Sequence, residues 1–116
     1  MTLPRRCFDY RALGRLKSGV MNKTEQRYAD YLEGLKHAGE ILFWKFEGVK
    51  LRLADNTSLT MDFMVLQKNC QLELHDVKGG FITDDANVKM KVAADIYPFT
   101  FKVVQWKNKQ WEIREI

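Results

Sequence analysis

Residues 61–78 read MDFMVLQKNCQLELHDVK, and this stretch decides the fold of the chain. It predicts two antiparallel strands, at residues 59–66 and 71–78, joined by a short polar turn at residues 67–69. The first strand contains Met61-Asp62-Phe63-Met64-Val65-Leu66, a run apolar enough to be buried on both faces. The only charged residue of that strand is Asp62, and a buried carboxylate needs a partner or a cation.

The second strand carries charged side chains in line with apolar ones. Every second side chain of a strand points to one face, so Asp76 and Lys78 continue the row of Leu72 and Leu74. A symmetric turn centred at about 68.5 to 69 places Asp62 opposite residue 75 or 76. The two carboxylates then meet at one end of the sheet, which favours a divalent cation held by oxygen ligands. The alternative is a buried Asp–Lys ion pair with no cation.

Around this hairpin, the sequence predicts helices and further strands. The expected segments are a helix at 22–37, strands at 41–46 leading into 49–53, a turn at 54–57, a second helix that Pro98 stops, and strands at 99–106 and 111–116. The crossover through the second helix predicts that the strands on either side of it, at 71–78 and 99–106, are parallel. We therefore expect a mixed α/β (α+β) domain with helices packed against a central mixed sheet.

The second helix is expected to begin at Asp84 or Asp85, either of which can cap it. Its expected apolar face consists of Val88, Val92 and Ile96, joined by Ala93.

Length and composition restrict the class of protein. The chain has 116 residues and is 46% hydrophobic, which suits one globular domain. No apolar stretch approaches the roughly 18 residues that span a bilayer, and the start of the chain does not resemble a secretory signal, so we expect a cytoplasmic protein with no membrane partner. The two cysteines, Cys7 and Cys70, and the two histidines, His37 and His75, have no ligand spacing and predict neither a zinc site nor a disulfide scaffold.

Positive charge is concentrated at the amino-terminal end. Residues 1–27 hold seven basic and two acidic side chains, and the remaining residues have a net charge of −1. Residues 1–21 are expected to form a basic arm, and residues 22–116 a single domain. The arm predicts contact with a polyanion, and a solvated leader is the alternative. The arm residues expected to bind nucleic acid are Arg5, Arg6, Arg11, Arg15 and Lys17.

Glu25 lies on the inward stripe of the first predicted helix, near its start. It is therefore a candidate third metal ligand. The alternative is a capping box with Asn22, in which the glutamate bonds back to the cap residue.

Five short motifs in order carry a resemblance to a known family. They are Lys23-Thr24-Glu25, Met61-Asp62-Phe63, Val77-Lys78-Gly79, Val88-Lys89-Met90-Lys91 and Tyr97-Pro98. In this arrangement the chain resembles the PD-(D/E)-x-K nuclease superfamily, over about residues 21–106, and is most similar to small phage-encoded endonuclease and Holliday-junction-resolvase-like proteins. Met61 stands where the family usually has proline, and Asp76 where it usually has glutamate.

The resemblance implies a restriction-endonuclease-like αβββαβ core with a metal site. Glu25, Asp62, Asp76 and the carbonyl of Val77 would bind magnesium, with manganese as a substitute, and Lys78 would orient the attacking water or stabilise developing charge. Lys89 would reach the scissile phosphate; its alternative is a solvated pair with Asp85. His75 points away from Asp76 and is expected to be structural or nucleic-acid-facing. The tryptophans at positions 44, 106 and 111 are expected to fill the core or a dimer surface.

The expected function is that of a metal-dependent DNA endonuclease. The resemblance further implies a phage or prophage protein in the host cytoplasm that acts as a homodimer, with branched DNA such as Holliday junctions as one candidate substrate. One alternative is a non-catalytic nucleic-acid-binding module with the same fold, and another is an assembly protein that uses its outer strands as an interface.

Overall fold

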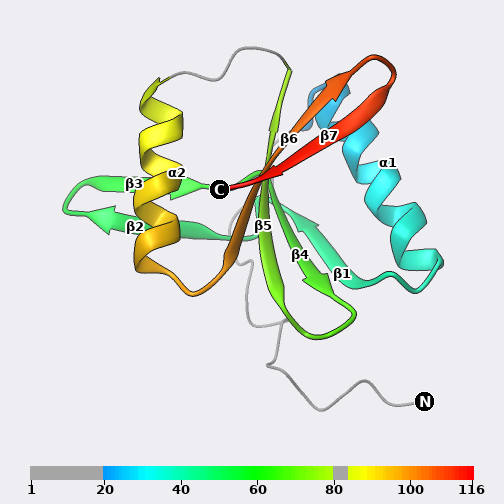
Figure 1. The fold of residues 1–116 in the computed structure, drawn as a ribbon, viewed down its shortest axis with the longest axis horizontal. Helices are drawn as coiled ribbons and strands as arrows, with labels where there is room; N and C mark the ends of the chain where they lie inside the picture. Colours follow the sequence, from blue (N-terminus) through cyan, green and yellow to red (C-terminus); the bar gives the residue numbers. More distant parts are fainter. Residues whose placement is uncertain (1–19, 80–83) are drawn as a thin grey trace.

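The computed structural model describes residues 20–79 and 84–116 as a mixed α+β fold with two helices, a mixed five-stranded sheet and a separate two-stranded hairpin (Figure 1). The elements, in chain order, are α1 (Lys23–His37), β1 (Ile41–Phe46), β2 (Lys50–Ala54), β3 (Thr57–Thr60), β4 (Phe63–Gln67), β5 (Leu72–Lys78), α2 (Asp84–Ile96), β6 (Thr100–Lys107) and β7 (Gln110–Glu115). The residues of the expected basic arm lie outside the described part, apart from the last two. None of the described helices is both long and apolar enough to cross a membrane.

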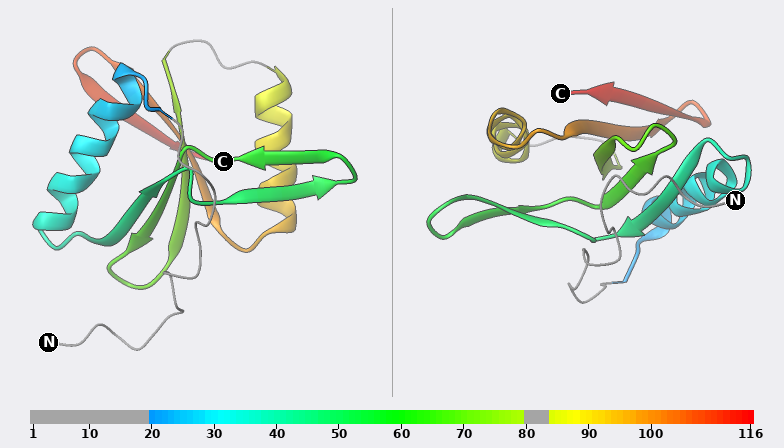
Figure 2. Two further views of the ribbon diagram at one scale, coloured as in Figure 1. Left: turned by 180° about the vertical axis from the view of Figure 1, so that it is seen from behind. Right: turned by 90° about the horizontal axis from the view of Figure 1, so that it is seen from below.

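The main sheet has the strand order β1-β4-β5-β6-β7. All neighbouring strands are antiparallel except β5 and β6, which are parallel. Because α2 connects those two strands, the predicted crossover is confirmed. Figure 2 shows α1 on one face of this sheet and α2 beside the β2–β3 hairpin.

The register of β4 and β5 fixes the position of the charged residues. Phe63 pairs with His75, which centres the hairpin on residue 69 and aligns Asp62 with Asp76. This is one of the two registers that the sequence predicted. The turn contains Cys70 at a φ of 72°. Cys70 is half-buried and disulfide-bonded, which contradicts the prediction that the cysteines form no disulfide scaffold, because a disulfide depends on where the fold places the cysteines and not on their spacing in the sequence.

The strand expected at residues 59–66 is in fact two strands in two sheets. β3 pairs only with β2, whereas β4 lies between β1 and β5 in the main sheet. The break falls at Asp62, whose backbone carbonyl accepts a hydrogen bond of 2.7 Å from the N–H of Glu47. Glu47 has a φ of 50° and marks the matching break between β1 and β2. Asp62 therefore lies at a corner before β4, so its side chain is not packed among the apolar side chains of that strand.

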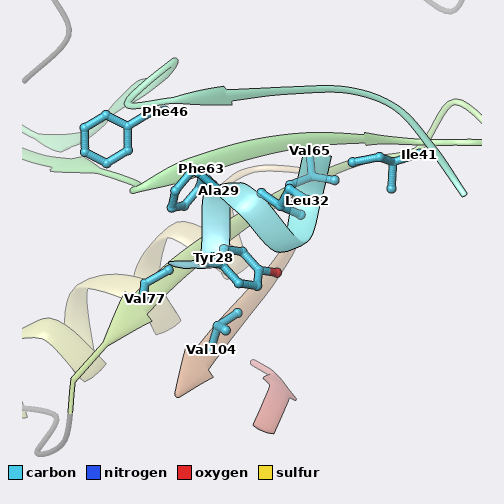
Figure 3. Close-up of a cluster of buried hydrophobic side chains, with 9 residues drawn as sticks. All are labelled: Tyr28, Ala29, Leu32, Ile41, Phe46, Phe63, Val65, Val77 and Val104. Carbon is cyan, nitrogen blue, oxygen red and sulfur yellow. The ribbon is translucent and has the colours of Figure 1, made fainter. Parts of the chain in front are cut away.

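Helix α1 begins with the predicted capping box. Asn22 is the N-cap, and the chain leaves the helix through Gly39, which adopts a φ of 82° that favours glycine. The helix buries Tyr28, Ala29 and Leu32 against β1, β4, β5 and β6, as Figure 3 shows. Tyr28 is fully buried and contacts Phe63 edge to face at 5.3 Å between ring centroids. This packing holds the start of α1 against the β4–β5 pair.

Of the four residues in the predicted apolar face of α2, only Ala93 is buried. Val88, Val92 and Ile96 are exposed at 57%, 39% and 51%, and the buried positions are Met90 and Ala93. The small Ala93 side chain lets the helix approach the sheet and the β2–β3 hairpin closely. Both aspartates lie within the first turn of α2, since the helix already begins at Asp84.

Candidate functional site

A pair of aspartates forms the centre of the site. Asp62 lies at the corner before β4, and Asp76 lies within β5 with only 6% of its surface exposed. One oxygen of Asp62, Oδ2, accepts a hydrogen bond of 2.8 Å from the backbone N–H of Val77. The two carboxyl groups are also hydrogen-bonded to each other. The hairpin register and the corner at Asp62 thus bring together the two carboxylates that the sequence predicted to meet.

The two carboxyl groups cannot both carry charge at low cost. Burial, the hydrogen bond to Asp76 and the charge of Asp76 raise the pKa of Asp62 to about 8, although the Val77 N–H acts in the opposite direction. The charge of Glu25 raises the pKa of Asp62 slightly further. Asp62 therefore holds a proton near neutral pH, and a cation bound at this place would displace it.

Lys78 completes the cluster. Its Nζ lies 2.8 Å from Oδ2 of Asp76, and 26% of the lysine side chain is exposed. The predicted row of β5 is confirmed, because Leu74 packs in the core on the α2 side and Asp76 and Lys78 follow at alternate positions. The same contact is compatible with a catalytic lysine and with an ion pair that only compensates the charge of Asp76.

Glu25 occupies its capping position. Its Oε1 accepts a hydrogen bond of 3.0 Å from the N–H of Asn22, and Oδ1 of Asn22 accepts one of 2.8 Å from the N–H of Glu25. Its influence on the pKa of Asp62 shows that the carboxylate lies within electrostatic reach of the aspartate pair. Within the described ranges, no three His, Cys, Asp or Glu side chains are arranged to hold a metal ion. The acidic side chains brought into contact are therefore two, with Glu25 nearby.

Of the expected nucleic-acid contacts, only Lys89 lies in the described part of the chain. Nζ of Lys89 lies 3.8 Å from Oδ2 of Asp85, which is the alternative that the sequence offered for this lysine. The arm residues Arg5, Arg6, Arg11, Arg15 and Lys17 lie outside the described part of the chain.

A second polar network lies on the opposite face of β5 and was not predicted. Oε1 of Glu73 accepts hydrogen bonds from Nε2 of Gln67 at 2.9 Å and from Nζ of Lys102 at 3.0 Å. Nε2 of His75 lies 2.9 Å from the same oxygen, and Nδ1 of His75 lies 2.6 Å from the hydroxyl of Tyr28. These distances suit a ring whose Nε2–H donates to Glu73 while the Tyr28 hydroxyl donates to Nδ1. His75 is therefore structural, as one of its two predicted roles stated.

The side chains of this network are hydrogen-bonded to one another and largely buried. Burial raises the pKa of Glu73, but hydrogen bonds and charges from His75 and Lys102 outweigh it and lower the pKa to about 2. Burial raises the pKa of Tyr28 well above its usual range. Among the described residues, no buried side-chain nitrogen or oxygen lacks a hydrogen-bond partner. The alternation of Glu73 and His75 in β5 was a signal for this network, whereas the contribution of Tyr28 depends on how α1 packs.

Comparisons of the chain with models of protein families, with curated proteins and with solved structures found no match.

Proposed function

We propose that the chain is a metal-dependent DNA endonuclease that hydrolyses phosphodiester bonds. The observation that carries the proposal is the cluster of Asp62, Asp76 and Lys78, in which two carboxyl groups and an ammonium group meet at the break between two sheets. The strand order supports it, because the helix, the antiparallel β1-β4-β5 group and the parallel β6 after α2 suit a restriction-endonuclease-like core. The resemblance of the motifs to the PD-(D/E)-x-K superfamily points to the same residues.

The donor atoms fit a hard divalent cation. Magnesium is usually held by one or two carboxylates, with water and substrate phosphate completing its coordination. Asp62 and Asp76, with the carbonyl of Val77, would hold it, and a bound cation would favour the charged form of Asp62, which burial and then the neighbouring Asp76 disfavour. Glu25 would have to leave the cap of α1 to join them. When bound, magnesium or manganese would act as a Lewis acid and lower the pKa of bound water.

The side chains of this chain would orient the groups that react. The Val77 N–H fixes one oxygen of Asp62, which turns the remainder of the carboxyl group toward Asp76. Lys78 is partly exposed, so its ammonium group can reach a phosphoryl oxygen or an attacking water from the side of Asp76. Removing its positive charge would leave developing negative charge without a donor at that position.

The proposed function also includes a substrate, an oligomeric state and a location in the cell. We include branched DNA such as a Holliday junction as a candidate substrate, a homodimer as the active species, and the cytoplasm of a phage host as the location. These parts come from the resemblance and from the basic amino-terminal residues.

A second candidate function is a nucleic-acid-binding module without catalysis. One observation favours it: Glu25 is committed to the cap of α1, which leaves two acidic side chains in contact in the described part of the chain. Such a module would bind DNA with a steep salt dependence that magnesium barely changes.

Cleavage of supercoiled plasmid and of a synthetic four-way junction separates the two functions. Wild type, Asp76→Asn, Lys78→Gln and the control Lys68→Gln are compared in magnesium, manganese and EDTA; Lys68 is an exposed lysine in the turn between β4 and β5. The nuclease predicts metal-dependent cutting by wild type and the control, and its loss in the other two variants. Binding without cutting in every metal would establish the second function instead.

A further inference from the structure

The turn between β6 and β7 lies at the same end of the sheet as the aspartate pair. Lys78, at the end of β5, pairs in register with Gln105, so β6 continues past it through Trp106 and Lys107. From a rise of about 3.3 Å per residue and a strand spacing of about 4.8 Å, the backbone of Lys107 lies on the order of 8 Å from that of Lys78. Helix α1 reaches this end of the sheet, because Arg27 in its second turn contacts Trp106 of β6.

Arg27 is held in place above this turn. Its guanidinium carbon lies 4.6 Å from the ring centroid of Trp106, and Trp106 in turn contacts Trp111 edge to face at 4.9 Å. Stacking on an indole fixes a guanidinium group while leaving its N–H donors available for a planar anion. Trp106 is half-buried, so it serves as the support of Arg27.

The cations near this turn form no ion pair with any acid in the described part of the chain. Arg27 is exposed, and so are Lys23 one helical turn before it and Lys107 and Lys109 in the turn. None of the four forms an ion pair with another described residue, whereas the cations Lys78, Lys89 and Lys102 all do. Side chains that place several unpaired positive charges together, one of them pre-oriented, are suited to phosphate groups.

We infer that Lys23, Arg27, Lys107 and Lys109, supported by Trp106, form a surface that binds the phosphates of a DNA strand next to the phosphodiester at Asp62 and Asp76. This inference rests on the proposed function. Arg27 and Trp106 lie on the α1 face and Asp76 and Lys78 on the α2 face, so a strand that crosses the end of the sheet meets both groups. The separation of roughly 8 Å between the backbones of Lys78 and Lys107 is on the order of the distance between neighbouring phosphates of one DNA strand.

Equilibrium binding of a fluorescently labelled DNA duplex tests the inference with calcium in place of magnesium. The test variant combines Arg27→Gln, Lys107→Gln and Lys109→Gln. The matched control combines Lys36→Gln, Lys50→Gln and Lys68→Gln, which removes the same charge from exposed lysines elsewhere. We expect the test variant to lower the slope of log Kd against log salt concentration by about two to three and to raise Kd at least ~10-fold, because each lost phosphate contact contributes about one to the slope.

The control is expected to keep the wild-type slope. Equal weakening of both variants would overturn the inference, since net charge alone would then explain the effect. Arg27→Lys retains the charge but loses the planar stacked group, so it should bind more weakly than wild type; equal binding would remove the role of stacking. Tighter binding of a duplex RNA of the same sequence would contradict DNA as the ligand.

Failure of this inference is distinguishable from failure of the nuclease proposal. If wild type cuts DNA and the test variant binds and cuts as wild type does, the surface is wrong and the nuclease remains. If the test variant loses binding and wild type does not cut, the surface stands and the catalytic function fails. If wild type does not bind DNA at all, both fail.

Discussion

Replacing Asp62 with asparagine is expected to make the metal-free protein more stable at neutral pH. The pKa of Asp62 is about 8 in the folded protein and 3.8 as the ordinary value. A group whose folded pKa is raised contributes its full stability below the ordinary value and loses it as the pH rises toward the folded value. Wild type should therefore become steadily less stable between about pH 4 and pH 8 through this one group.

The magnitude follows from the size of the shift. At pH 7 Asp62 ionises in the unfolded chain but stays mostly protonated in the folded chain. Ionisation therefore stabilises the unfolded chain and lowers the free energy of unfolding by about 4 kcal/mol, at ~1.4 kcal/mol per pKa unit. Asparagine does not ionise, and it retains an oxygen for the Val77 N–H and an amide that can donate to Asp76. Allowing for burial of the new amide, a net gain of about 2 to 4 kcal/mol is expected.

Urea unfolding in EDTA at several pH values measures this gain. Asp95→Asn, at an exposed position of α2, is the control and should match wild type within about 0.5 kcal/mol. The advantage of Asp62→Asn should be largest near pH 8 and shrink as the pH falls toward 4. A variant that is equally or less stable than wild type at pH 7, or whose advantage does not change with pH, would refute the reasoning about the aspartate pair.

Three other predictions concern the same pair, the buried network and α2. Magnesium at 100 times its Kd should stabilise wild type against urea by about 2.7 kcal/mol and Asp62→Asn much less, because binding to the folded state alone adds stability. Glu73→Gln should make the free energy of unfolding, measured in urea, depend less on pH in the acid range. The pKa of Glu73 is lowered to about 2, so its carboxylate stabilises folded wild type above about pH 4.5. Wild type should lose up to about 3 kcal/mol of this stabilisation as the pH falls through 2, and the variant should not. Val92→Ser should change the thermal midpoint little because Val92 is exposed, whereas Ala93→Leu should destabilise by about 1 to 3 kcal/mol through overpacking of a fully buried site; equal effects would contradict the observed face of α2.

Much of the fold followed from local patterns. The alternation along β5 and the short turn after β4 determine which residues face each other, so the meeting of Asp62 and Asp76 was predictable. The N-cap of α1 at Asn22 and the end of that helix at Gly39 are likewise each determined by residues that are close together in the chain. In each case, the residues that decide the structure lie within one hairpin or one helical turn.

The features that sequence reasoning missed depend on contacts between distant elements. Val88, Val92 and Ile96 were assigned to the core together with Ala93 because their apolar spacing is regular, yet the β2–β3 hairpin and the sheet bury Ala93 with Met90 instead. The division at Asp62 likewise depends on a matching break at Glu47. The Tyr28–His75 hydrogen bond joins residues 47 positions apart. Periodicity within one element cannot supply such information.

The proposed metal-dependent cleavage is measured with wild type and Asp62→Asn, in preparations whose stability is known. We expect wild type to cut plasmid or junction DNA in magnesium or manganese and not in EDTA. Asp62→Asn should bind the same DNA and be the more stable protein, but should not cut. Cutting by Asp62→Asn at the wild-type rate, or intact binding with no cutting by wild type in any metal, would show that the aspartate pair is not a nuclease site.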